Sequence, residues 1–400
     1  MAKSRLTIGL ALLLSLLTLV SATTAFSAPD EVRWSQESIP TEGEVGGWVL
    51  ANGSDVQHLT MATDGTLYAY IDGLTYTLYK STDGGCSWSH SSNVSDTIVD
   101  IATDANDAST IYYASPTNVY KSVNAGDSFQ PLAANPALTG SDNIEITSID
   151  VARWGESNIV VTGTRDTDFD EYGGVYVLKE QTFSQWLDTD IDNYDVYSVA
   201  FSPGFASDQQ IVAVVTDGTD SFITTKMGNT GWGQTIGDAR LDRDNSGASV
   251  AVSISADIAF PDDYISEAAA GFYVQFVAVD AGGDNGDVYI VYGFEAPDSS
   301  VAIDLNIGSS YGLNNIDVTS LAVCGNATTA HLLAGVAGDG QVYLSHDGGT
   351  SWTRSLKEPT GQSKTYVLMA PDFLSCGKAY AATRGSESAF SVTLDGGVTW

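Results

Sequence analysis

The chain has 400 residues, with 16 Lys and Arg against 50 Asp and Glu, which gives a formal net charge of −34. Nucleic acids and anionic lipid surfaces are both bound through clustered basic residues, so this charge argues against both partner classes. A hydrophobic content of 43% argues against a disordered chain, because enough apolar side chains are present to build a large core.

Residues 1–28 have the pattern of a secretory signal peptide. Lys3 and Arg5 precede an apolar run over 6–20, and small residues follow up to Ala28. The run is shorter than the ~20 residues that a transmembrane helix needs, so cleavage is favoured over an uncleaved membrane anchor. The sequence therefore predicts an exported protein that is secreted or held in the cell envelope, with residues 29–50 as an N-terminal segment.

One eight-residue motif, here called the corner motif, occurs four times: at 81–88, 122–129, 345–352 and 393–400. Its pattern is Ser/Thr-x-Asp/Asn-x-Gly-x-x-aromatic. The defining residues are Ser81, Asp83, Gly85, Trp88, Ser122, Asn124, Gly126, Phe129, Ser345, Asp347, Gly349, Trp352, Thr393, Asp395, Gly397 and Trp400. A short Asp or Asn side chain accepts hydrogen bonds from the backbone N–H groups just ahead of it, and glycine supplies the positive φ of a tight turn. Each motif is therefore predicted to be a hairpin corner whose aromatic residue packs inward.

The corner motifs belong to a longer repeat of short apolar strands separated by loops. Seven units of about 32 to 43 residues are found, three of them with degenerate corners. Their approximate ranges are 56–88, 98–129, 146–186, 197–232, 252–294, 318–352 and 366–400. Four short strands at this period are typical of a propeller blade. We therefore predict an all-β fold, a seven-bladed β-propeller, over residues 51–400.

Propellers usually close by pairing strands from both chain ends in one blade. Residues 32–40 resemble residues 352–359, which follow a corner motif, so we expect them to supply the outer strand of the last blade. Because the sequence stops on the last residue of a corner motif, we also expect the natural chain to continue beyond Trp400.

The corner motifs resemble the Asp-box, or BNR, repeats of sialidases, sortilin-type receptors, xyloglucan-degrading glycosidases and photosystem II assembly factors. The resemblance covers the chain from about residue 50 onward and suggests a bacterial exported BNR-repeat protein. In that family the Asp box lies at the blade periphery, away from the substrate face. The resemblance therefore implies a structural role for Asp83, Asp347 and Asp395.

No catalytic residue can be selected from the sequence. With 50 acidic residues, candidate carboxylate pairs are unavoidable, and the early Arg-Ile-Pro motif typical of sialidases is missing. Two runs place acidic side chains on alternating positions: Asp166, Asp168 and Asp170, and Asp188, Asp190 and Asp192. Calcium prefers six to eight hard oxygen ligands, so we predict calcium at these runs, with solvated acidic loops as the alternative. No other cofactor is expected.

Three cysteines remain, Cys86, Cys324 and Cys376, and an odd number cannot be fully paired within one chain. A bridge between Cys324 and Cys376 and a set of three free thiols are both compatible with the sequence.

These features favour an exported cell-surface or surface-layer-like propeller that acts as a non-catalytic binding or structural module. Its partners would be proteins or glycans at the cell surface, or further copies of itself in a lattice. The first alternative is a glycoside hydrolase of the sialidase or xyloglucanase type. The second is an assembly factor for a membrane complex, which the scarcity of basic residues disfavours.

Overall fold

The computed structural model describes residues 55–400 except 134–135, 137–142, 169, 182–183, 266–270, 297–298 and 386–389. The predicted signal peptide and the predicted closing strand at 32–40 lie outside the described residues. Within the described ranges, no helix combines the length and the apolar character needed to cross a membrane.

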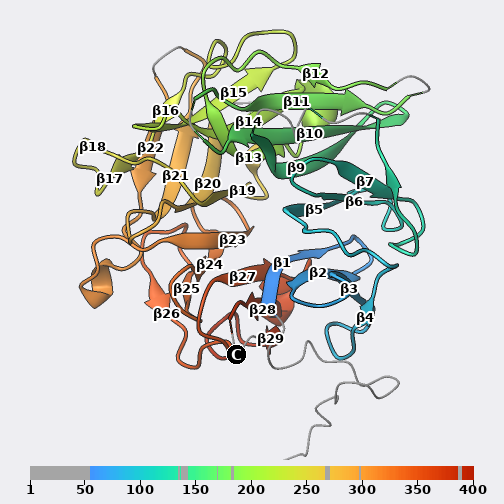
Figure 1. Cartoon of the computed structure of the whole chain (residues 1–400). Helices are drawn as coiled ribbons and strands as arrows, with labels where there is room; N and C mark the ends of the chain where they lie inside the picture. The colour runs from blue at the N-terminus through green and yellow to red at the C-terminus, as the bar shows by residue number, and fades with distance from the viewer. Residues whose placement is uncertain are drawn as a thin grey trace, which may run out of the picture. The chain divides into compact units, whose positions relative to one another are not determined.

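Seven antiparallel sheets are arranged around a common axis, as predicted, and in the described residues only two short α-helices accompany them (Figure 1). In every sheet the strands are hydrogen-bonded in chain order, and the first strand is the innermost. The first three sheets contain β1 (Asp55–Met61), β2 (Leu67–Asp72), β3 (Leu78–Ser81) and β4 (Ser89–His90); β5 (Asp100–Thr103), β6 (Ile111–Ala114), β7 (Val119–Ser122) and β8 (Gln130–Pro131); and β9 (Ile144–Trp154), β10 (Ser157–Asp166), β11 (Gly174–Lys179) and β12 (Leu187–Asp188).

The other four sheets complete the ring, and we number the blades 1 to 7 in chain order. They contain β13 (Asp195–Phe201), β14 (Gln210–Thr216), β15 (Ser221–Met227) and β16 (Ala239–Arg240); β19 (Ser255–Ala259), β20 (Tyr273–Asp280), β21 (Val288–Gly293) and β22 (Val301–Asp304); β23 (Val318–Cys324), β24 (His331–Val336), β25 (Val342–Ser345) and β26 (Thr353–Arg354); and β27 (Thr365–Met369), β28 (Ala379–Thr383) and β29 (Phe390–Thr393). A separate hairpin, β17 (Asp242–Arg243) and β18 (Ala248–Ser249), lies between blades 4 and 5 in the chain. Short helices α2 (Phe205–Asp208), η2 (Ser309–Tyr311) and α4 (Phe373–Cys376) lie in connections.

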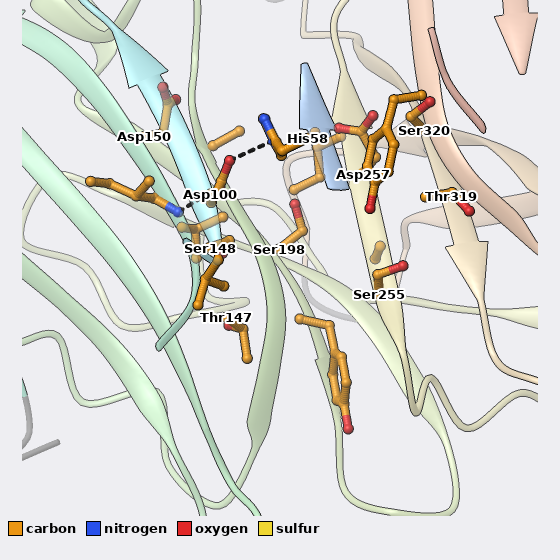
Figure 2. A pocket seen from close by; sticks show the side chains of 18 of the residues that line it. His58, Asp100, Thr147, Ser148, Asp150, Ser198, Ser255, Asp257, Thr319 and Ser320 are labelled. Atoms are coloured by element: carbon orange, nitrogen blue, oxygen red, sulfur yellow. Dashed lines mark hydrogen bonds and ion pairs between the residues drawn. The ribbon is translucent and has the colours of Figure 1, made fainter. Parts of the chain in front are cut away.

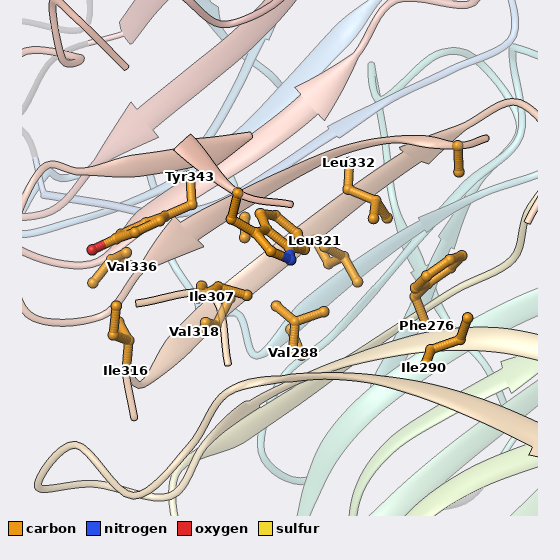
Figure 3. Close-up of a cluster of buried hydrophobic side chains, with 14 of the residues drawn as sticks. Phe276, Val288, Ile290, Ile307, Ile316, Val318, Leu321, Leu332, Val336 and Tyr343 are labelled. Atoms are coloured by element: carbon orange, nitrogen blue, oxygen red, sulfur yellow. The ribbon is translucent and has the colours of Figure 1, made fainter. Parts of the chain in front are cut away.

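The hydrophobic core is divided among the seven interfaces between neighbouring blades. Both faces of each sheet are covered, so the central strands are largely apolar without strict alternation, and every residue of β20 is buried. One cluster joins blades 5 and 6, with Phe276, Val288 and Ile290 facing Val318 and Leu332 (Figure 3). Equivalent clusters fill the other six interfaces. Each blade is thus stabilised by two neighbours.

The ring closes where β1 packs against β27 and β28. Val56 and Trp88 of blade 1 share a buried cluster with Tyr380 and Ala382 of blade 7. At the edge of this contact the Asp55 carboxylate accepts a hydrogen bond from the backbone N–H of Gly385 at 3.1 Å. Side-chain packing therefore joins the first and last blades within the described part of the chain.

Blade 7 has three hydrogen-bonded strands in the described residues, where the other blades have four. The end of the chain is held by blade 6, because the Trp400 backbone N–H donates to the Lys357 carbonyl at 3.0 Å. Its indole Nε1 also donates to the Ser355 hydroxyl at 3.0 Å. All three cysteines are free thiols in this structure.

Candidate functional site

A cavity with a volume of about 670 Å³ lies on the propeller axis. It is lined by the innermost strand of every blade, namely β1, β5, β9, β13, β19, β23 and β27. We call it the axial channel. Figure 2 shows its polar side chains, with His58, Asp100, Asp150 and Asp257 facing a space that several serine and threonine hydroxyls also border.

Three channel aspartates connect neighbouring blades. The Asp100 carboxylate accepts from the backbone N–H of Ile101 at 2.7 Å and, in the next blade, from that of Ile149 at 2.8 Å. Asp150 in turn accepts from Val151 and from Phe201 of blade 4, both at 2.7 Å. One carboxylate thus satisfies a donor on its own strand and a second donor across the blade interface.

Blades 5, 6 and 7 are connected in a similar way. Asp257 of blade 5 accepts from the backbone N–H of Leu321 in blade 6 at 2.8 Å. The Ser320 hydroxyl accepts from the backbone N–H of Val367 in blade 7 at 2.8 Å. These side chains therefore fix the spacing of the inner strands at the channel wall.

Several other polar atoms of the channel are buried without a hydrogen-bond partner in the described structure. They are the hydroxyls of Ser148, Ser255 and Thr319, and Nδ1 of His58. Ser148 and Thr319 are only 6% and 5% exposed. A buried polar group that lacks a partner costs about 1–3 kcal/mol, so these atoms are suited to contact a ligand or ordered water.

His58 pairs with Asp100, with Nε2 lying 2.8 Å from the carboxylate oxygen Oδ1. Burial disfavours the imidazolium, but the charge and hydrogen bond of Asp100, together with the charge of Asp257, outweigh burial and raise the pKa of His58. The channel thereby holds a hydrogen-bonded pair in which the base and the acid come from adjacent blades.

Two further aspartates of the channel, Asp150 and Asp257, have pKa values raised above their ordinary range. Burial, reinforced by the nearby charge of Asp100, raises the pKa of Asp150 to about 7 despite its two backbone hydrogen bonds. Burial likewise raises the pKa of Asp257 to about 6. Both groups therefore change protonation close to neutral pH.

The corner motifs begin at the end of the third strand of their blades and, in blades 1, 2 and 6, lead into the fourth strand; none of their residues lines the axial channel. In the motif at 345–352, the Ser345 hydroxyl donates to Asp347 at 2.8 Å and accepts from the Gly349 N–H at 3.0 Å. The Asp347 carboxylate accepts from the Ser351 N–H at 2.9 Å, and the Trp352 indole donates to the Gly349 carbonyl.

The other three corner motifs have the same Ser/Thr, Asp/Asn and Gly contacts. Their aromatic residues differ in detail. Trp88 repeats the indole bond to its own glycine, at Gly85, whereas Phe129 packs edge-on against Tyr113 at 4.9 Å. Burial opposes ionisation of Asp83, Asp347 and Asp395, but hydrogen bonds from within the motif lower their pKa.

The two acidic runs are arranged differently. Asp166, Asp168 and Asp170 each bring one carboxylate oxygen to within 4.8 Å of the others. A hydrogen bond with Asp170 raises the pKa of Asp168, which reflects crowding of like charges at an exposed position. Asp166 itself is buried and accepts from the backbone N–H groups of Asp168, Asp170 and Glu171.

The second run does not form such a group in the described residues. Asp188, Asp190 and Asp192 instead line a small cavity of about 220 Å³ beside Gly173 and Gly174. Calcium binding at either run stays a prediction.

The channel residues were not identified from the sequence as a candidate site, although the sequence contains a pattern that marks three of them. In the first strand of three units a charged residue interrupts an apolar run, at Asp100, Asp150 and Asp257. Side chains alternate between the two faces of a strand, so sequence alone does not show whether an interrupting residue faces a neighbouring blade or the axis. The packing of seven blades decides that these side chains converge.

The chain matches no protein-family model and no curated protein sequence. Similar solved structures exist. YCF48 from Cyanidioschyzon merolae has a TM-score of 0.53 and 14% identity, over 86% of this chain and 95% of that chain. A structure of YCF48 bound to D1 peptide has a TM-score of 0.53 and 16% identity, over 86% and 94%.

The extracellular domain of BT4673 from B. thetaiotaomicron also has a TM-score of 0.53 and 14% identity, over 86% of this chain and 39% of that chain. At these identities the likeness is one of fold. Together with the seven sheets and their axial channel, it shows that this chain has a β-propeller fold.

Proposed function

We propose that this chain is an exported, non-catalytic binding module of the cell envelope, and that its axial channel binds a polypeptide with basic side chains. The observation that carries the proposal is the channel wall itself. It combines carboxylates fixed by backbone hydrogen bonds with buried hydroxyls that have no partner in the described structure.

A carboxylate whose two oxygens already accept backbone hydrogen bonds is better suited to binding a ligand than to transferring a proton. Both oxygens of Asp100 and of Asp150 accept backbone N–H groups, so moving either side chain toward a substrate would break the connection between two blades. The hydroxyls of Ser148 and Thr319 carry no such structural bond and are available to a ligand.

Charge indicates the chemistry of the partner. Asp100, Asp150, Asp257 and Glu145 line the channel, together with Arg165 and with His58, which pairs with Asp100, and the whole chain carries a formal charge of −34. Such a field attracts basic ligands and raises their association rate. A polypeptide partner is further supported by the complex of the similar propeller YCF48 with D1 peptide.

The proposal also covers the repeat family of this chain and its export from the cell. The hydrogen bonds inside the four corner motifs support membership of the Asp-box repeat proteins. The signal-like residues 1–28 support export. A cell-surface glycan, and a lattice of further copies of this chain, are alternative partners. An assembly factor for a membrane complex would have the same binding activity with a membrane-protein partner.

The experiment is a titration of the purified chain with two fluorescent peptides of equal length, one rich in Lys and Arg and one rich in Glu, at low and high salt. We expect the basic peptide alone to bind, with an affinity that falls as salt screens the charges. The double variant S148A/T319V should bind at least about fivefold more weakly at an unchanged melting temperature, because neither hydroxyl has a partner to lose.

The matched control is Thr219→Ala, which truncates an exposed side chain in the turn between β14 and β15. It should leave both affinity and stability unchanged. Equal affinity for the two peptides, or full affinity in the double variant, would contradict the proposal.

One observation favours glycoside hydrolysis as the second candidate. A carboxyl with a pKa of about 7, such as Asp150, is protonated often enough to serve as a general acid, and Asp100 lies nearby as a second carboxylate. Turnover of xyloglucan or a sialoside that disappears in Asp150→Asn would establish this candidate and replace the binding role.

A further inference from the structure

Two histidines that do not line the axial channel face each other on blade 6. His331 is the first residue of β24, and His346 is the second residue of the corner motif that follows β25. The two Nδ1 atoms are 2.8 Å apart, and the ring centroids are 4.6 Å apart with an interplanar angle of 66°. The pair follows from strand register, because Leu332 lies opposite Ser345 and the next opposed positions are 331 and 346.

The backbone of one histidine and the ring of the other are held by neighbouring residues. The backbone around His346 is closed by the hydrogen bonds among Ser345, Asp347 and Gly349. The ring of His331 packs edge-on against Phe373 of α4, with centroids 5.8 Å apart. Donor atoms on fixed elements lose little freedom when they bind a ligand, which is the condition for a preorganised site.

The fold itself does not require this pair. In blade 1 the same register positions hold Thr66 and Thr82, because Leu67 lies opposite Ser81. In blade 2 these positions hold Thr110 and Val123, and in blade 7 they hold Lys378 and Leu394. The corner motif thus forms with threonine, valine or leucine in place of histidine, so the pair in blade 6 is an addition to the scaffold.

We propose that His331 and His346 form a two-nitrogen site for a divalent transition-metal ion of the Zn²⁺, Ni²⁺ or Cu²⁺ class. Neutral imidazole is a preferred ligand of these ions, whereas Ca²⁺ and Mg²⁺ prefer oxygen. Two nitrogens bound to one tetrahedral ion at ~2.0–2.1 Å are roughly 3.3 Å apart, so the two rings need to separate by only about half an ångström.

Binding of the metal ion by the two neutral imidazoles requires no proton donor or acceptor outside the pair. In the neutral pair one Nδ1–H donates to the other Nδ1. When both Nδ1 atoms bind the ion, the donating ring carries its proton on Nε2 instead, and no proton leaves the pair. Water completes the coordination, and the net charge of −34 concentrates cations around the molecule.

The test is calorimetric titration of the full chain, prepared without a polyhistidine tag, with ZnCl₂, NiCl₂ and CuCl₂, and with MgCl₂ and CaCl₂ for comparison. We expect one equivalent of a transition ion to bind. Affinity should fall at least about tenfold in either His331→Thr or His346→Thr, because each variant removes one of only two protein ligands. Both variants reproduce the residues of blade 1, so the fold should be retained.

The matched control is His90→Ala, which removes an exposed imidazole of β4 and should leave binding unchanged. Proton NMR gives a second measurement on the unmodified chain, which has four histidines. Substoichiometric Cu²⁺ should broaden the ring signals of two histidines and spare the other two. Wild-type affinity in either threonine variant, or equal broadening of all four histidines, would overturn the proposal.

Discussion

Aspartates of the axial channel and aspartates of the corner motifs use the same chemistry in opposite settings. Asp150 accepts backbone hydrogen bonds from two blades, lies half-buried in the channel wall and has a raised pKa. Asp347 accepts bonds from its own eight-residue motif, lies near the surface and has a lowered pKa. The comparison shows that two factors set the contribution of an aspartate to stability. They are whether its hydrogen bonds join two blades or one turn, and how far water reaches its carboxylate.

The largest expected effect comes from removing a channel carboxylate. Asp150→Ala leaves the N–H groups of Val151 and Phe201 without their acceptor, and each unsatisfied buried donor costs about 1–3 kcal/mol. We expect the free energy of unfolding in urea to fall by about 2–6 kcal/mol. Asp150→Asn keeps one acceptor oxygen and should lose less. A cost no larger than that of a corner variant would remove the distinction between the two regions.

The second effect is an opposite response to pH. The pKa values of Asp150 and Asp257 are raised above the unfolded value of ~3.9, so their contribution to stability is complete below that value. It is lost as pH rises through about 7 and about 6, respectively. The raised pKa of His58 acts in the same direction, since its contribution is complete below the unfolded value of ~6.5 and is lost as pH rises through the folded value.

The corner aspartates have lowered pKa values, so their contribution is present above pH ~4 and is lost as pH falls below it. We therefore expect the melting temperature to fall from pH 5 to pH 8, and to fall again below pH ~4. Asp150→Asn should flatten the upper slope and leave the lower one unchanged. A wild-type melting temperature that rises from pH 5 to pH 8 would contradict this assignment.

A corner aspartate should cost less when removed. Asp347→Ala breaks the bonds to the Ser351 N–H and hydroxyl, but water replaces them at this exposed site. We expect a loss of about 1 kcal/mol in the free energy of unfolding, as for other turn-closing side chains. Asp347→Asn is the matched control, because Asn124 occupies the same position in the motif at 122–129, and it should be nearly neutral.

The smallest expected effect concerns a third group of aspartates, those at 166–170. If Asp166, Asp168 and Asp170 bind calcium, millimolar Ca²⁺ should raise the melting temperature by a few degrees through preferential binding to the folded chain. Magnesium should have little effect, and Asp168→Asn should abolish the calcium shift. No calcium shift in the wild type would leave these residues as a solvated acidic loop.

Much of the architecture could be predicted from local pattern. Repeated apolar strands, and corners such as those at 81–88 and 345–352, predicted seven blades, because these features depend on short-range backbone geometry. The fourth strand of the last blade stays a prediction, since residues 32–40 lie outside the described structure. The predicted calcium runs remain untested, although Asp166, Asp168 and Asp170 do lie together.

The sequence by itself determined the repeat, the corner motifs and the acidic charge. The first two depend on residues that are close in the sequence, and the charge depends on composition alone. Only the tertiary structure decided which acids meet at the axis and that His331 meets His346. The physical reason is that strand register and blade packing join residues of distant sequence. Asp100 and Ile149 are 49 positions apart, yet one hydrogen bond connects them.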